Sequence, residues 1–261
     1  MLEGMRMANE GMIAMQQQQA VITNNLANVG TAGYRKEVMD VESFSSVMNR
    51  QMKRMGKVNL PGKSANGFLQ ASGGMDVKGM LYTSTRTSYS QGSLKMTNNK
   101  FDLALDDNGR GFFTIRTKDG IQFTRNGSFR LSTDGHLVAS DGSKLMGQKG
   151  PIKISGTDFE VTNNGIVKVG DKEVDRLLIT EFPDKSNVSK YGEGNFQATD
   201  GFKISNNFQV KQGYLEMANV NAVKEMVDMM RTMRAFEANQ KVLQAEDQAL
   251  RKSVNEVGKT G

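Results

Sequence analysis

Apolar residues recur at spacings of three and four near both ends of this sequence, with polar residues between them. The stripe near the N-terminus contains Met5, Ala8, Met12, Met15, Ile22 and Leu26. The stripe near the C-terminus contains Met226, Met229, Met233, Phe236, Leu243, Leu250 and Val254. This spacing is typical of a helix with one narrow apolar seam, and such a seam needs a partner. The pattern predicts two terminal helices that pack on each other or on copies from neighbouring subunits.

Polar side chains interrupt both stripes, and they leave two interpretations open. Gln19 stands in the first stripe, and Gln240 and Asp247 stand in the second. If the seam drifts around the helix, these side chains are exposed. If they are buried, they fix the register of an assembly, as one buried polar residue does in a coiled coil. Gly4 and Gly11 lower the helix propensity of the first segment.

The middle of the chain alternates between apolar and polar residues and contains regularly spaced turn signals. Asp-Gly and Asn-Gly pairs stand at residues 119–120, 126–127, 134–135 and 141–142. These dipeptides suit tight turns because they tolerate positive φ at low cost. Short runs such as residues 111–116 lie between them. Short strands with turns at this spacing predict a β-rich domain of hairpins.

These patterns predict an α+β fold in which two long terminal helices form a coiled-coil stalk and a β-rich hairpin domain is inserted between them. Residues 1–35 are expected to hold the N-terminal helix, and residues 36–79 a connector that is partly extended. Residues 80–212 are expected to form the β-rich domain. Residues 213–261 are expected to hold the C-terminal helix, from a pattern that begins after Gly213.

The chain carries a net charge of +6, and part of the excess is concentrated in the expected connector. No acidic residue stands between Glu42 and Asp76, where the basic residues are Arg50, Lys53, Arg54, Lys57 and Lys63. This stretch is either a solvated basic linker or a patch that meets an anionic partner. Nucleic acid is not the expected partner, because no aromatic interleaving and no nucleic-acid motif accompany the charge.

Candidate catalytic and metal-binding residues are few. The sequence has no cysteine and one histidine, which excludes thiolate chemistry and a metal centre built from several histidines. Asp102, Asp106 and Asp107 form an acidic cluster, but the alternation before them favours a strand that runs into a polar turn. His136 follows the turn at residues 134–135, and an exposed turn histidine is expected there. We therefore expect no catalytic, cofactor-binding or metal-binding residues and no enzymatic activity.

No segment of the sequence predicts membrane insertion or a cleaved signal peptide. The first fifteen residues contain Glu3, Arg6 and Glu10 and no continuous apolar run. No stretch approaches the ~18 apolar residues that a spanning helix needs. The chain is therefore expected to stay in the cytosol or to leave it by a route that cleaves no conventional signal.

Three co-linear segments resemble the signatures of bacterial flagellar rod and hook proteins. The N-terminal segment comprises Asn24, Asn25, Leu26, Ala27, Asn28 and Val29, followed by residues 31–35, which include Gly33 and Arg35. The central one comprises residues 91–94, 102–105, 111–113 and 123–129, and the C-terminal one comprises residues 212–221, with Asn219 and Asn221, and 233–239. The resemblance spans nearly the whole chain in the right order, which makes it specific at the level of the family.

This resemblance implies a structural axial subunit of the flagellar basal-body rod. Members of the family place their terminal helices in an inner coiled-coil tube and their β-rich domain outside it. They leave the cell through the flagellar type III export apparatus and assemble helically into the periplasmic drive shaft that transmits torque from motor to hook. Implied partners are copies of the chain itself, neighbouring rod and hook subunits, the export apparatus and the surrounding ring proteins.

Alternatives remain within and outside this family. The chain length and the single modest β domain favour a rod subunit over the longer hook protein. A hook protein and a hook-scaffolding or capping protein remain open, and so does the choice between proximal and distal rod. Outside the family, an enzyme with a helical dimerisation stalk would need a polar constellation that the sequence lacks.

Overall fold

The computed structural model describes residues 2–43, 81–155, 159–192, 194–198 and 201–257. Residues 44–79 of the expected connector, with its basic stretch, lie outside the described residues. The chain forms two compact units, each made from separate parts of the sequence. The first comprises Met1–Asn24, Glu37–Arg86 and Val223–Gly261, and the second comprises Asn25–Lys36 and Thr87–Ala222.

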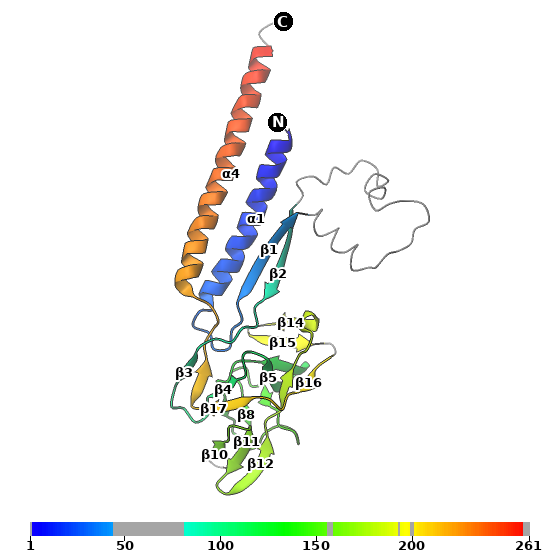
Figure 1. The fold of residues 1–261 in the computed structure, drawn as a ribbon, viewed down its shortest axis with the longest axis vertical. Coiled ribbons are helices and arrows are strands. Elements are labelled where there is room, and N and C mark those ends of the chain that lie inside the picture. The colour runs from blue at the N-terminus through cyan, green and yellow to red at the C-terminus, as the bar shows by residue number, and fades with distance from the viewer. Residues whose placement is uncertain (1, 44–80, 156–158, 193, 199–200, 258–261) are drawn as a thin grey trace, which may run out of the picture. The chain divides into compact units, whose positions relative to one another are not determined.

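The first unit contains most of two helices and a two-stranded ribbon. The helices are α1 (Leu2–Ala27) and α4 (Ala222–Val257), and the ribbon pairs β1 (Glu37–Ser43) with β2 (Leu81–Thr87). The helices lie side by side (Figure 1). A methyl group on Gly4 would lie 2.7 Å from a carboxylate oxygen of Glu246, and one on Gly11 would lie 3.0 Å from the Asn239 amide. The two contacts run in opposite directions along the chain, so the helices are antiparallel.

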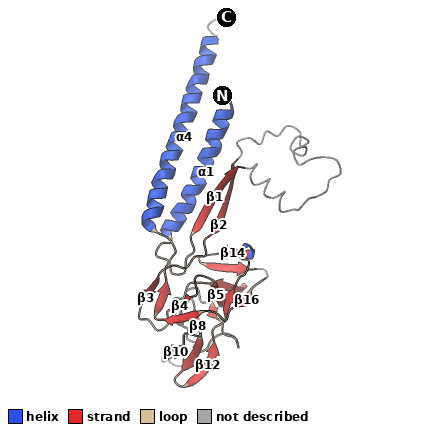
Figure 2. Cartoon of the chain, in the orientation of Figure 1, coloured by secondary structure: helices blue, strands red, loops and turns tan. Residues whose placement is uncertain are grey.

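The predicted coiled-coil stalk is wrong, and with it the predicted fold class. Among the described elements, two α-helices accompany eighteen strands, and most of these strands belong to the β-rich second unit (Figure 2). On α4, polar Asn239 and Glu246 stand against glycines of α1. Met226 and Met233 of the predicted seam are 50% and 46% exposed. At these positions glycine meets polar side chains, and part of the predicted seam is open, whereas a coiled coil needs interlocking apolar rows.

The second unit is organised around a nine-stranded sheet in the order β14-β15-β6-β5-β9-β8-β7, in which β13 also pairs with β5 and β16 pairs with β13. The pairings between these strands are antiparallel. The strands are β5 (Gly111–Thr117), β6 (Gly120–Thr124), β7 (Arg130–Leu131), β8 (Leu137–Val138), β9 (Lys144–Leu145), β13 (Ile179–Glu181), β14 (Val188–Tyr191), β15 (Asn195–Ala198) and β16 (Lys203–Ile204). A short 3-10 helix, η1 (Lys185–Asn187), precedes β14.

Three smaller sheets complete the described part of this unit. One has the order β10-β11-β12, and the other two pair β17 with β4 and β18 with β3. Their strands are β3 (Leu94–Met96), β4 (Leu103–Asp106), β10 (Phe159–Val161), β11 (Ile166–Val169), β12 (Lys172–Arg176), β17 (Gln209–Gln212) and β18 (Tyr214–Glu216). The segment after Gly213 therefore begins with a strand, and α4 begins only at Ala222.

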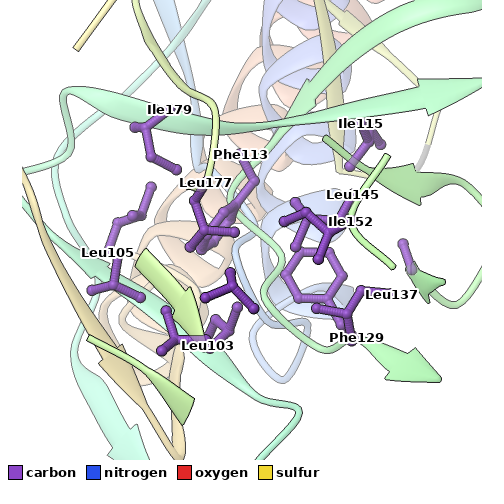
Figure 3. Close-up of a cluster of buried hydrophobic side chains, with 14 of the residues drawn as sticks. Leu103, Leu105, Phe113, Ile115, Phe129, Leu137, Leu145, Ile152, Leu177 and Ile179 are labelled. Atoms are coloured by element: carbon purple, nitrogen blue, oxygen red, sulfur yellow. The ribbon is translucent and has the colours of Figure 1, made fainter. Parts of the chain in front are cut away.

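Strand β5 explains why the second unit has two apolar clusters. Successive side chains of a strand point to opposite faces of the sheet. Phe113 and Ile115 therefore join the larger core, while Phe112 joins a smaller aromatic cluster with Phe123 and Phe196. Figure 3 shows Phe113 within the larger core, where its ring meets Phe129 edge-on with the centroids 5.4 Å apart. The hairpin expected at residues 119–120 joins β5 to β6, with Thr117 opposite Gly120.

Candidate functional site

Four oppositely charged side chains are buried together in the second unit, and three of them come from the signature segments. The Arg35 Nη1 atom lies 2.5 Å from Glu216 Oε1. Arg125 bridges two carboxylates, with Nη1 3.2 Å from Glu216 Oε2 and Nη2 2.5 Å from Asp107 Oδ1. All four side chains are at most 1% exposed. We call Arg35, Arg125, Asp107 and Glu216 the ionic junction.

Hydrogen bonds from the backbone stabilise the buried carboxylates of the ionic junction. Asp107 accepts hydrogen bonds from the amides of Gly109, Arg110 and Gly111. Glu216 accepts one from Gly92, 2.9 Å away. Burial lowers the pKa of the Arg35 guanidinium, and the Glu216 charge opposes that shift. Two positive and two negative groups balance, which is the condition under which buried charges are tolerated.

Close backbone packing holds the N-terminal signature against the rest of the junction. Gly33 has φ +70°, and a side chain there would collide with the backbone of Arg125 and Asn126. Its amide donates a 2.7 Å hydrogen bond to the Glu216 carbonyl oxygen. A side chain on Gly92 would collide with the Met217 carbonyl oxygen. These positions therefore require glycine for a steric reason that concerns folding.

Asparagines of the signature segments form side-chain hydrogen bonds with loop residues that are distant in the sequence or follow α1. The Asn219 side chain accepts a hydrogen bond from the Lys36 amide at 2.7 Å and donates to the carbonyl oxygens of Ser88 and Ser90, both at 2.9 Å. Asn25 is buried and accepts a hydrogen bond from the Tyr34 hydroxyl.

The other signature residues occupy more open positions. Asn28 accepts a hydrogen bond from the Thr31 hydroxyl. Leu26 is half-buried, and Asn24, Ala27 and Asn221 are exposed.

The predicted seam residues do not form one continuous buried row. On α1, Ile22 is buried, and the half-buried members are Met5, Met12, Met15 and Leu26. On α4, Met226 and Met233 are exposed, whereas the half-buried members are Met229, Phe236, Leu243 and Leu250. The side chain of Val254 lies outside what the structure describes. Burial within this chain therefore divides the α4 stripe into a partly covered row and an open row.

The open row, Met226 and Met233, belongs to an exposed apolar strip along the first half of α4. Met230 is 52% exposed and Val223 is 71% exposed, beside Met226 and Met233. We call Val223, Met226, Met230 and Met233 the methionine face. Among the polar interruptions, Gln19 is half-buried, while Gln240 and Asp247 are exposed. Asp247 forms an ion pair with Arg251, one turn later on the same helix.

The three aspartates of the acidic cluster, Asp102, Asp106 and Asp107, each interact with a different partner. Asp106 pairs with Lys211 at 2.6 Å across β4 and β17, and Lys211 lowers the pKa of that carboxyl chiefly by hydrogen bonding. Asp102 accepts a hydrogen bond from Asn99, and Asp107 belongs to the ionic junction. His136 is half-buried instead of exposed, with its Nδ1 atom 3.3 Å from the Ile152 carbonyl oxygen.

The described residues contain neither a candidate metal site nor a candidate membrane span. No three or more histidine, aspartate or glutamate side chains gather there in a way that could hold a metal ion. No helix in the same part of the chain is long and apolar enough to cross a bilayer.

Sequence reasoning missed the ionic junction, although its residues stand in readable contexts. Arg125 follows the buried strand β6 directly, and Arg35 follows the buried Tyr34. A charged residue directly beside a segment that is expected to be buried is a signal of a buried pair. Asp107, with glycines two and four residues later, is typical of a turn in which a carboxylate accepts backbone amides. No sequence pattern identified Glu216 as the common partner of Arg35 and Arg125.

Comparisons with known protein families match three successive segments of the chain to flagellar rod and hook families. Residues 5–35 match the family described as flagella basal body rod protein, and residues 108–169 match the flagellar hook protein FlgE/F/G D1 domain. Residues 211–256 match the flagellar basal body rod FlgEFG protein C-terminal family.

Single relatives match over nearly their whole length. The flagellar basal-body rod protein FlgG of Buchnera aphidicola subsp. Baizongia pistaciae is 31% identical, over 97% of this chain and 98% of the relative. FlgG of Agrobacterium fabrum is 30% identical over 95% and 96%, respectively. The flagellar hook-basal body complex protein FlhO of Bacillus subtilis is 28% identical over 99% of this chain and 100% of the relative.

Proposed function

Because this chain belongs to the family of flagellar basal-body rod and hook proteins and is a structural subunit of the basal-body rod, we propose that the methionine face of α4 is a surface through which it joins neighbouring subunits. Its place is the flagellar basal body, and its partners are other rod and hook subunits. The single observation that carries the proposal is the half-exposed row of apolar side chains on α4.

Exposed apolar area is the physical reason for choosing this face. Burying apolar surface contributes roughly 25 cal/mol per Å², so covering several such side chains favours association. Methionine suits a repeated, imperfectly regular contact because its unbranched side chain adapts to irregular gaps. Beyond Met233, the same side of α4 carries Glu237, Gln240 and Gln244, which are exposed and polar. The face is therefore confined to the first half of the helix.

The remaining parts of the proposal concern the setting of assembly. We propose that the subunits stack helically into the periplasmic rod, through contacts that do not close into a ring, and thereby transmit torque to the hook. The export apparatus would deliver the chain without a cleaved signal, and surrounding ring proteins are further candidate partners. The proposal includes no enzymatic activity.

Replacing Met226 and Met233 with aspartate tests the methionine face. Both side chains are about half exposed, so the subunit should fold while incorporation fails. The matched control places aspartates at Gln240 and Gln244, which adds the same charge to the same helix at exposed polar positions. In cells that lack the natural gene product, the amount of each variant in purified hook–basal bodies is the measurement. Equal incorporation of the two double variants would reject the face.

A further inference from the structure

The methionine face presents three thioethers in a single line. Met226, Met230 and Met233 follow one another at spacings of four and three, which places them on one side of a helix. Their exposed fractions are 50%, 52% and 46%. Half of each side chain is therefore open to small solutes in the free subunit, and a neighbouring subunit would cover it on assembly.

Methionine is also the sulfur-containing residue that an oxidant meets on this chain. The sequence contains 18 methionines and no cysteine, so no thiol of the chain competes for a peroxide. The thioether sulfur takes one oxygen atom from a peroxide to become a sulfoxide. In that step the peroxide O–O bond breaks and an S–O bond forms. The sulfur loses two electrons, and hydrogen peroxide is reduced to water.

We propose that Met226, Met230 and Met233 form an oxidation site at which peroxide blocks incorporation of the free subunit into the rod. This inference rests on the proposed function, because it requires the same face to be buried between subunits. A sulfoxide is polar, and burying it without a hydrogen-bond partner disfavours association. Each modified residue is expected to weaken assembly by roughly tenfold or more. Once the face is covered by a neighbour, access of peroxide to the sulfur is reduced.

Oxidation of the purified full-length chain tests the accessibility of the site. Limited hydrogen peroxide is added, and sulfoxide at each methionine is quantified over time from peptide fragmentation spectra. Met226, Met230 and Met233 should oxidise together with Met96, which is 56% exposed. Met146, which is 7% exposed, is the slow internal reference. Oxidation of the three α4 residues no faster than Met146 would overturn the proposal.

A second experiment links oxidation to incorporation. Wild-type subunit is induced during a brief peroxide pulse, and sulfoxide is compared between hook–basal bodies and the unincorporated pool. Sulfoxide at the three α4 methionines should be concentrated in the unincorporated pool, whereas sulfoxide at Met96 should be equal in both. An equal distribution at all four positions would refute the inference. Absence of the untreated protein from hook–basal bodies would instead refute the proposed function.

A leucine variant separates oxidation from loss of apolar surface. Leucine at positions 226, 230 and 233 keeps the volume and helix propensity but cannot be oxidised. Each variant is compared with its own untreated sample: the peroxide pulse should not lower incorporation of the triple variant further, whereas it should lower incorporation of Met96→Leu by the same factor as that of the wild type. If the triple variant proves as sensitive as the wild type, the damage lies elsewhere and the site is rejected.

Discussion

Replacing Glu216 with glutamine should destabilise the second unit more than any exposed charge replacement. Glu216 contacts Arg35 at 2.5 Å and Arg125 at 3.2 Å, and its side chain is 1% exposed. Glutamine keeps the shape and can still accept the hydrogen bond from Gly92. It leaves two buried guanidinium groups with Asp107 as their remaining carboxylate in the junction, so the cluster changes from neutral to one net positive charge. Removing one partner of a buried pair costs about 3–5 kcal/mol.

The assay is urea unfolding of the full chain followed by tyrosine fluorescence. The sequence has no tryptophan and five tyrosines, and four of these tyrosines, at positions 34, 89, 191 and 214, lie in the second unit. With a urea dependence of about 1–3 kcal/mol per molar, a loss of 3 kcal/mol lowers the midpoint by about 1 M or more.

Asp106→Asn is the matched control for this measurement. It removes the ion pair between Asp106 and Lys211, whose side chains are 38% and 41% exposed, respectively. Water and salt screen such an exposed pair, so its loss should shift the urea midpoint little. If the two variants unfold at indistinguishable midpoints, the junction does not carry the stability that we assign to it.

Two further changes test the geometry and the electrostatics of the second unit. Gly33→Ala should lower the free energy of unfolding by at least about 1–3 kcal/mol, because the position has φ +70° and faces the Arg125 backbone; an unchanged urea midpoint would show that the loop can move aside. The Lys211 side chain lowers the pKa of Asp106, so the stability that this pair contributes is present at neutral pH and disappears as the pH falls through the lowered pKa. Wild type and Asp106→Asn should therefore converge in acid, and a constant difference between their urea midpoints at every pH would contradict the assignment.

Periodicity identified where the helices lie but not what they contact. The N-terminal pattern predicted a helix within residues 1–35, and α1 spans Leu2–Ala27. The same apolar spacing wrongly predicted a coiled coil, because a heptad stripe records only which residues share a side. In the structure, Gly4 and Gly11 of α1 stand against the polar side chains of Glu246 and Asn239 on α4. From the sequence alone these glycines were interpreted as weaknesses of the helix, whereas they provide space for Glu246 and Asn239.

The ionic junction could not be predicted because its members follow no period. Arg35 and Glu216 are separated by 181 positions, and Arg35 stands beside Lys36 and Glu37, so its charge does not look isolated in the sequence. The signature asparagines were identified by resemblance to a family, which gave their identity but not their hydrogen bonds. Asn219 shows the difference, because its role depends on three loop positions, Lys36, Ser88 and Ser90, that only the fold brings together.

The separation of 181 positions between Arg35 and Glu216 also fixes an order of events during synthesis. A ribosome completes the N-terminal partner long before it reaches the C-terminal one. Any nascent or prematurely terminated chain that stops before Glu216 lacks one of the two carboxylates that neutralise the buried arginines. The second unit therefore cannot reach its final form while translation is still in its middle segment. Completion of this unit therefore reports that translation has passed Glu216.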